Sequence, residues 1–415
     1  MNILWSVNTL MPWVASEIGV KSSHAISWVD AMSKELVKDE NIHLAIASVA
    51  KVRMLKKVEI NGVVYYIIPS REIDKGWEFV LNDFNPEVIH LYGTEKTHNI
   101  PLIKHSEINS RIVISLQGIL KGYARVYYGG IDVSVLVKNL TLKDLLRSSV
   151  FSGRKSFEKG IKTEEWQLQH VKYVEGRSTW DRVYAMSINP DLKYFYCPRL
   201  IREPFYRIQW SLEKMERHSI FVHQGNYPIK GLHFLFEALP HLIKKYPDLK
   251  LYIAGNDILH RDSLFKKLTR NGYSKYLLSL YKKLNIENYV VFLGSISAEE
   301  VAKRLSITNA MVIPSVIENC PNSLAEAMLV GTPSVASYVG GNAELLNYGQ
   351  CGELYCYNEP LMLAESIDKI FSSETLAKNY SMKSRELALE RHNPAKLKNT
   401  LLGIYDQIIK NDEKL

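Results

Sequence analysis

The feature that most constrains the fold of this chain is an alternation of short apolar segments with helical patterns, which occurs twice. In the first half, five apolar segments have the length of buried strands, at residues 3–7, 42–48, 63–68, 88–91 and 112–116. From residue 220 the alternation restarts, with predicted strands at 220–223, 250–254, 290–293 and 310–313. Strands that alternate with helices favour parallel sheets, so two such runs predict two doubly wound α/β domains.

The clearest helical patterns cover residues 22–36, 232–245 and 298–305, and Ser22 or Ser23 is the expected N-cap of the first. A chain of 415 residues is long for one hydrophobic core and suits two domains of about 200 residues. Two prolines precede the second run, so we expect the domains to join near residues 206–217. Ligands of such sheets bind beyond the carboxyl ends of the strands, and the crevice between the domains is therefore the expected site.

The most informative motif lies at residues 314–333, directly after the predicted strand 310–313. Its loop carries Glu318, and Pro321 is placed to open a helix that carries Glu326 and stops near Gly331. Free backbone N–H groups near Asn322 and Ser323 would point into the same crevice, where an anionic or hydroxyl-rich ligand is favoured. The alternative is that both glutamates are ordinary solvated surface residues.

This motif and the Val-Gly-Gly-Asn-Ala-Glu run that ends at Glu344 resemble the donor-sugar site of the family 4 retaining glycosyltransferases. The resemblance implies the GT-B fold, in which two Rossmann-like doubly wound α/β domains face each other across a cleft. It implies that Glu318 contacts the hydroxyls of the transferred sugar and that Glu326 holds the ribose of the nucleotide. It also implies an acceptor-binding domain at residues 1–206, a donor domain at 207–393 and a C-terminal helix, 394–415, that crosses back onto the first domain.

Further residues of the second half match the same family. Lys230 and the glycine after it match a Lys-Gly pair on the donor phosphates, although a lysine at a helix start is often only solvated. The family's preceding arginine is replaced by Gly225, followed by Asn226, so another cation is expected to help hold the phosphates. Gly255 and Ile296 match loops that flank the nucleotide base, and they are equally typical of turns at strand ends.

The first half offers sugar- or acceptor-binding candidates. Gly19, in the loop after the first strand, stands where the family usually has two glycines. Gln117 stands where many relatives have His-Gly; an amide can bind hydroxyls but cannot shuttle protons at neutral pH. Arg177 lies in a run that looks like a segment of bacterial capsule and O-antigen enzymes, and it can supply the missing cation or have a structural role beside Asp181. His90 is predicted to be a buried strand residue.

The positive charge of the chain is concentrated in one region. Residues 101–200 contain sixteen Lys and Arg against nine Asp and Glu, out of a formal net charge of +8 for the whole chain. Such a surface can bind nucleic acid, anionic lipid or a phosphorylated substrate. No nucleic-acid motif is present, so we predict peripheral contact with an anionic membrane and no nucleic-acid partner. The stretch 133–151 has the pattern of an interfacial helix, which is also that of an amphipathic core helix.

Other patterns are absent from the sequence. No segment approaches the roughly 18 apolar residues of a spanning helix, the first residues suggest a strand rather than a signal peptide, and the four cysteines are scattered. We therefore expect the cytoplasm, or the inner face of the membrane. The sequence has no Asp-x-Asp, GxGxxG or Walker motif and no Ser-His-Asp motif, which favours transfer without a metal or other cofactor.

The resemblance implies a retaining glycosyltransferase that moves a sugar from a nucleoside-diphosphate sugar to a saccharide or lipid-linked acceptor, in surface polysaccharide synthesis. Glu318 and Lys230 are the expected catalytic residues. A sugar-nucleotide epimerase or a phosphorylase of the same fold is the rival among enzymes. From another class, the chain can be a catalytically silent binding or scaffold subunit, which the missing arginine at Gly225 keeps open.

Overall fold

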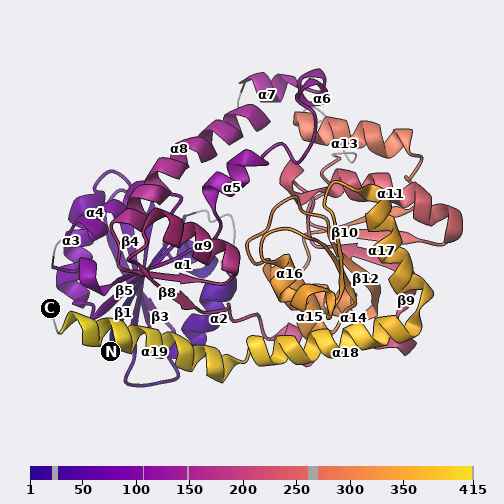
Figure 1. Cartoon of the computed structure of the whole chain (residues 1–415). Helices are drawn as coiled ribbons and strands as arrows, with labels where there is room; N and C mark the ends of the chain where they lie inside the picture. The colour runs from indigo at the N-terminus through magenta and orange to yellow at the C-terminus, as the bar shows by residue number, and fades with distance from the viewer. Residues whose placement is uncertain (21–26, 106, 147–148, 260–269, 414–415) are drawn as a thin grey trace. The chain divides into compact units, whose positions relative to one another are not determined.

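A computed structural model describes residues 1–20, 27–105, 107–146, 149–259 and 270–413, and these form two compact units (Figure 1). Unit 1 consists of the described parts of residues 1–120, 159–201 and 392–415, and unit 2 of those of 121–158 and 202–391. Each unit is an α/β domain built around one sheet, which confirms the prediction of two Rossmann-like domains. Ser22 and Ser23 lie outside the described residues.

The described part of unit 1 holds an eight-stranded sheet in the order β3-β4-β2-β1-β5-β6-β7-β8. Its strands are parallel except β3, which pairs antiparallel with β4 at the edge. The bounds are β1 (Asn2–Val7), β2 (His43–Ala50), β3 (Lys56–Ile60), β4 (Val63–Pro69), β5 (Val88–Tyr92), β6 (Ile112–Ser115), β7 (Tyr173–Gly176) and β8 (Lys193–Tyr196). The five predicted strands of the first half are confirmed, and β3, β7 and β8 were not predicted.

Helices flank this sheet. They are α1 (Pro12–Glu17), α2 (Ser27–Leu36), α3 (Ile73–Phe84), α4 (Ile100–Lys104), α9 (Thr179–Ile188) and α19 (Pro394–Asp412), while α8 (Val150–Gln169) begins in unit 2 and ends in unit 1. The C-terminal helix α19 is fastened in unit 1 through Tyr405, whose hydroxyl accepts a hydrogen bond from Trp5 Nε1 at 2.9 Å and lies 2.7 Å from His90 Nδ1. His90 is fully buried in β5, as predicted.

The described part of unit 2 holds a six-stranded parallel sheet in the order β11-β10-β9-β12-β13-β14. Its strands are β9 (Glu216–Val222), β10 (Lys250–Ala254), β11 (Val290–Gly294), β12 (Thr308–Ile313), β13 (Ser334–Ser337) and β14 (Glu353–Tyr355). Its helices are α5 (Leu120–Arg125), α6 (Val133–Lys138), α7 (Leu142–Leu146), α10 (Pro204–Arg207), α11 (Leu232–Lys245), α13 (Gly272–Lys283), α14 (Ala298–Ile307), α15 (Asn322–Val330), α16 (Asn342–Leu345), α17 (Pro360–Ser372) and α18 (Glu374–Arg391). The four strands and two helices predicted here are confirmed.

The described residues of 121–158 belong to unit 2, whereas the predicted division placed them in a first domain of residues 1–206. They group with unit 2 because their backbone is held there. His233 Nε2 lies 2.9 Å from the carbonyl oxygen of Gly129, and Thr141 Oγ1 donates to the carbonyl oxygen of Arg270 at 2.9 Å. Such contacts between segments far apart in the chain leave no local signal in the sequence.

The predicted helix over residues 133–151 is interrupted. Asp132 caps α6, and Asn139 ends it by returning its side-chain amide to the carbonyl oxygen of Val135 at 2.8 Å. Thr141 and Asp144 then bond to each other's side chain and backbone at the start of α7. Polar side chains that bond to nearby backbone compete with helix continuation, so two short helices replace one. Within the described residues, no helix is long and apolar enough to cross a membrane.

Candidate active site

The sheet of unit 2 has one topological switch point, between its central strands β9 and β12. The chain proceeds from β9 to β10 and β11 on one side, and from β12 to β13 and β14 on the other, so the loops that follow β9 and β12 diverge. In open α/β sheets the crevice at such a point binds ligands. The β9 loop carries Gly225 and Lys230, and the β12 loop carries Glu318, so these three predicted residues belong to this crevice.

The two loops are fastened to each other by their backbones. The N–H of Val316 donates to the carbonyl oxygen of Ile229 at 2.9 Å. Gly231 has a φ of +67°, and a Cβ at this position would lie 1.7 Å from the carbonyl oxygen of Pro314. Only glycine allows both this left-handed conformation and this close approach. The Lys-Gly pair found in the sequence therefore has a steric reason for its glycine.

Lys230 and Glu318 form an ion pair, with Nζ 2.6 Å from Oε1. Ser315 Oγ donates to the same carboxylate oxygen at 2.7 Å. Glu318 is buried and Lys230 is partly buried, so the pair is sheltered from water while its cation stays accessible. The structure thus brings together the two residues that the sequence singled out as catalytic.

Glu326 lies in the second turn of α15 and is held by Arg202, whose Nη2 is 2.6 Å from Oε1. His223 Nε2 is 3.6 Å from the other carboxylate oxygen, Oε2. Burial lowers the pKa of His223 against the opposing charge of Glu326, while the charges of Arg202 and Lys230 lower it further. The environment of His223 therefore favours the neutral imidazole.

Arg202 and His223 were not identified from the sequence. His223 closes a predicted strand, so the rule that ligands bind at carboxyl ends of strands could have found it. Arg202 is 124 residues from Glu326 in the chain, and no local pattern signals this pairing.

The remaining predicted donor residues lie on neighbouring loops of unit 2. Asn322 and Ser323 form the start of α15, which has Pro321 as N-cap and no side-chain cap, so first-turn amides face outward from the helix. Gly255 follows β10 and bonds to Gly294 at the end of β11, with N···O 2.8 Å, and Ile296 lies two residues beyond. Gly255 and Ile296 therefore lie at the carboxyl edge of the sheet, one and two strands away from β9.

Gly225 has a local reason not to be an arginine. A Cβ at this position would lie 2.5 Å from Leu232 Cδ2, in the first turn of α11. Leu232 is fully buried, so a side chain at residue 225 requires the helix start to rearrange. Asn226, the next residue, is partly exposed.

The predicted residues of the first half belong to unit 1. Gly19 has a φ of +70° and open space around its Cα, whereas Gln117 and Arg177 follow β6 and β7. Arg177 Nη2 donates to the carbonyl oxygen of Gln117 at 2.9 Å, so the structure brings these two together. Arg177 is buried, and its backbone N–H donates to Asp181, which also completes the capping box of α9. Arg177 thus contacts both a predicted site residue, Gln117, and the N-terminus of α9.

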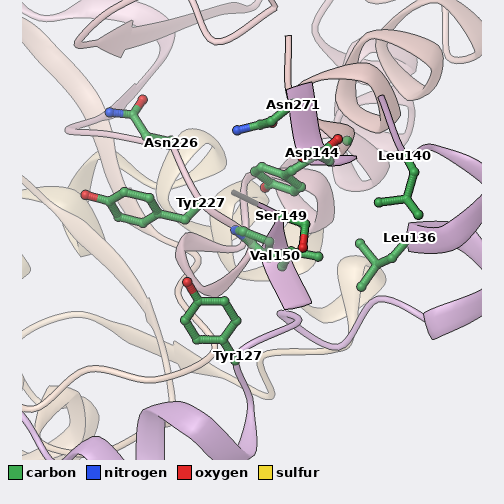
Figure 2. Close-up of a pocket in the computed structure, with 12 residues that line it drawn as sticks. Tyr127, Leu136, Leu140, Asp144, Ser149, Val150, Asn226, Tyr227 and Asn271 are labelled. Atoms are coloured by element: carbon green, nitrogen blue, oxygen red, sulfur yellow. The ribbon is translucent and has the colours of Figure 1, made fainter. Parts of the chain in front are cut away.

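A pocket of about 160 Å³ lies beside the β9 loop within unit 2 (Figure 2). The pocket is lined by Tyr127, Leu136, Leu140, Asp144, Ser149 and Val150, by residues 226–228 and by residues 271–273. Two polar side chains are already engaged, because Asp144 accepts from Thr141 and Asn271 caps α13 at the N–H of Ser274. The pocket thus combines three tyrosines and two leucines with the polar side chains of Ser149 and Asn226. Among the described residues, no group of three or more His, Cys, Asp and Glu side chains is placed to hold a metal ion.

The chain is similar to known proteins in sequence and in fold. Residues 203–387 match the family described as glycosyl transferases group 1. The chain is 29% identical over 199 residues to N-acetyl-alpha-D-glucosaminyl L-malate synthase of Bacillus anthracis, which covers 48% of each chain.

Among solved structures, sucrose-phosphate synthase of Thermosynechococcus elongatus superposes with a TM-score of 0.71 at 14% identity, covering 99% of both chains. Anabaena HepE in complex with UDP-glucose superposes with a TM-score of 0.64 at 14% identity, covering 100% of this chain and 99% of that one. The fold predicted from the sequence, GT-B, is thereby confirmed.

Proposed function

We propose that this chain, whose residues 203–387 match the family described as glycosyl transferases group 1, is a glycosyltransferase that transfers a sugar with retention from a nucleoside-diphosphate sugar to a saccharide or lipid-linked hydroxyl. The observation that carries this proposal is the charged cluster at the switch point of unit 2. It places two cations, Lys230 and Arg202, beside two carboxylates, Glu318 and Glu326. A diphosphate needs the cations, and sugar hydroxyls need the carboxylates.

In this proposal the diphosphate lies between Lys230 and the first turn of α15. Phosphate oxygens replace Glu318 as partners of Lys230, and the carboxylate of Glu318 becomes free to accept hydrogen bonds from sugar hydroxyls. Because Ser315 also holds Glu318, the carboxylate keeps its position during this exchange. The departing nucleoside diphosphate is stabilised by positive charge already in place, and such preorganised electrostatics commonly dominates catalysis.

Arg202 takes the place of the arginine that Gly225 lacks. It is paired with Glu326, for which we propose the ribose hydroxyls as ligand, and both its charge and that of Lys230 act on His223. We propose that Asn226 borders the phosphates and that Gly255 and Ile296 flank the base. Lys230, Arg202 and the helix amides supply the positive charge that a metal supplies elsewhere, so the proposed transfer needs no metal ion.

Glu318 is engaged by Lys230 and Ser315, which suits orientation of the donor sugar rather than attack on its anomeric carbon. The acceptor oxygen then bonds to the anomeric carbon on the face from which the diphosphate departs. The bond from that carbon to the phosphate oxygen breaks, and the departing phosphate oxygen accepts the hydroxyl proton. We propose unit 1 for the acceptor, with Gly19 and Gln117 at the carboxyl edge of its sheet. The reaction fits surface polysaccharide synthesis at the inner face of the membrane.

The test is an assay of nucleoside diphosphate release from UDP-, GDP- and ADP-hexoses, with and without a lipid-linked saccharide acceptor. We expect release from one donor, stimulated by acceptor, and an NMR spectrum that shows the donor's anomeric configuration in the product. Inversion would refute retention, and release from no donor would favour the silent scaffold.

A further inference from the structure

Five large aliphatic side chains project from α6 and α7 into solvent, in the space of fourteen residues. Leu142, Leu145 and Leu146 are 77%, 72% and 81% exposed, and Val133 and Val137 are about half exposed. Exposed leucines at this density are unusual, because contiguous apolar surface is normally covered by a partner or a membrane. We call these five residues the α6–α7 patch.

Other residues of the same two helices and of the turn between them hold α6 and α7 in unit 2. Leu136 of α6 is buried, and α6 lies beside α13 (Figure 1). Thr141, between the helices, donates to the carbonyl oxygen of Arg270 at 2.9 Å, and Asp144 of α7 is buried against Thr141. The backbone is therefore fixed, and the aliphatic side chains are presented outward by a rigid support.

The charge around the patch is positive. Residues 121–158 contain seven Lys and Arg against three Asp and Glu, and one of these acids, Asp144, is buried. Lys138 ends α6 and Lys143 lies in α7, next to the exposed side chains in the sequence. Leucines flanked by lysines combine the two attractions of a peripheral membrane site, which are burial of apolar surface and attraction to anionic headgroups.

We propose that the α6–α7 patch inserts into the headgroup region of an anionic lipid bilayer. This proposal names the surface through which the chain meets the membrane. It rests on the proposed function in one respect, because the reason for the contact is access to a lipid-linked acceptor. The charge disfavours a second copy as occupant, because a two-fold interface would bring the same lysines together from both copies. The purely aliphatic composition also differs from protein interfaces, which are enriched in aromatic residues, Met and Arg.

The test is co-sedimentation of the full chain with phosphatidylcholine vesicles, with and without about 30% phosphatidylglycerol. The patch variant is Leu142→Ser/Leu145→Ser/Leu146→Ser, which changes exposed side chains only. The matched control, Leu361→Ser/Met362→Ser/Met382→Ser, changes three other exposed apolar side chains of unit 2. A charge variant, Lys138→Ala/Lys143→Ala, separates electrostatic from apolar binding.

We expect the wild type and the control to bind anionic vesicles about tenfold better than the patch variant. The charge variant should lose the preference for anionic over neutral vesicles. Equal sedimentation of all variants, or none at all, would overturn the proposal. So would a wild-type dimer in analytical ultracentrifugation that the patch variant dissociates, because a second copy would then be the occupant. Nucleotide binding, measured without vesicles, should be the same in every variant, so failure here is distinguishable from failure of the proposed function.

Discussion

Lys230 and Glu318, 88 residues apart in the chain, meet at 2.6 Å on the two loops that follow β9 and β12. Without a ligand, the Lys230 ammonium and the Glu318 carboxylate neutralise each other at a position that is largely shielded from water. An incoming diphosphate can replace the carboxylate at Lys230, and a sugar can replace the ammonium at Glu318. In the proposed function, the ion pair is therefore the arrangement of the site before a ligand with both groups binds.

Removal of the Lys230 ammonium should reduce kcat/KM more than any other change of a single lysine. We expect Lys230→Ala to lower it by about 10²- to 10³-fold, the usual cost of one group that stabilises transition-state charge. Lys230→Arg should retain part of the activity, and Lys378→Ala, an exposed lysine of α18, should retain all of it. Steady-state kinetics with the preferred donor gives these ratios, and an active Lys230→Ala variant would contradict the phosphate role.

Substitutions of Arg202 and Glu326 should differ in which ligand they weaken, the nucleoside diphosphate or the nucleoside. Arg202→Ala should weaken binding of the nucleoside diphosphate by about tenfold, the value of one hydrogen bond to a charged group, and leave binding of the nucleoside nearly unchanged. Glu326→Ala should weaken both ligands equally, because both contain the ribose. Competition binding with the two ligands measures the difference, and identical patterns for the two variants would show that they act only through their mutual ion pair.

Gly231 should tolerate no side chain. Gly349, which also has a positive φ, provides the control. Gly349 has a φ of +93° and open space around its Cα, so Gly349→Ala should cost only the left-handed conformation, about 1 kcal/mol. Gly231→Ala adds a collision with the carbonyl oxygen of Pro314 and should lower the thermal midpoint more and abolish donor binding. Differential scanning fluorimetry compares the two variants, and equal midpoints would refute the steric argument.

Glu164 should make the stability of unit 1 depend on pH. Burial raises its pKa from 4.5 to about 7, while Thr94, Leu120 and Tyr184 donate hydrogen bonds to it. Since the folded state holds this proton more tightly, its stabilisation is complete below pH 4.5 and is lost as the pH rises through 7, by about 3 kcal/mol in total. Glu164→Gln cannot ionise, so its thermal midpoint should fall less than that of the wild type between pH 5 and 8. Parallel profiles would contradict the raised pKa.

The sequence predicted best those elements whose pattern lies within one continuous stretch of the chain. Residues 251–254 and 310–313 are continuous apolar runs, and β10 and β12 match the strands predicted at 250–254 and 310–313 within two residues. The motif around Glu318 was visible because the strand, loop and helix are consecutive. Strands such as β3, with three charged residues in five, and the four-residue β7 carry too little apolar pattern to be distinguished from loops.

Long-range pairing was beyond sequence reasoning. Arg202 lies near the predicted domain join, where a lysine or arginine is ordinarily solvated, and only the fold shows that it meets Glu326. The grouping of residues 121–158 with unit 2 depends on contacts such as that of Gly129 with His233, more than a hundred residues away. The same contacts orient α6 and α7 and so determine which of their leucines are exposed.

The central claim, that the cluster around Lys230 binds a nucleoside diphosphate, is tested most directly by isothermal titration calorimetry with UDP, GDP and ADP. For the wild type and Lys378→Ala, one nucleotide should bind with a Kd below about 1 mM, the upper range of enzyme substrates. Lys230→Ala should raise that Kd by about tenfold or more. A wild type that binds none of the three nucleotides, or a Kd that is the same with and without the Lys230 ammonium, would contradict the claim.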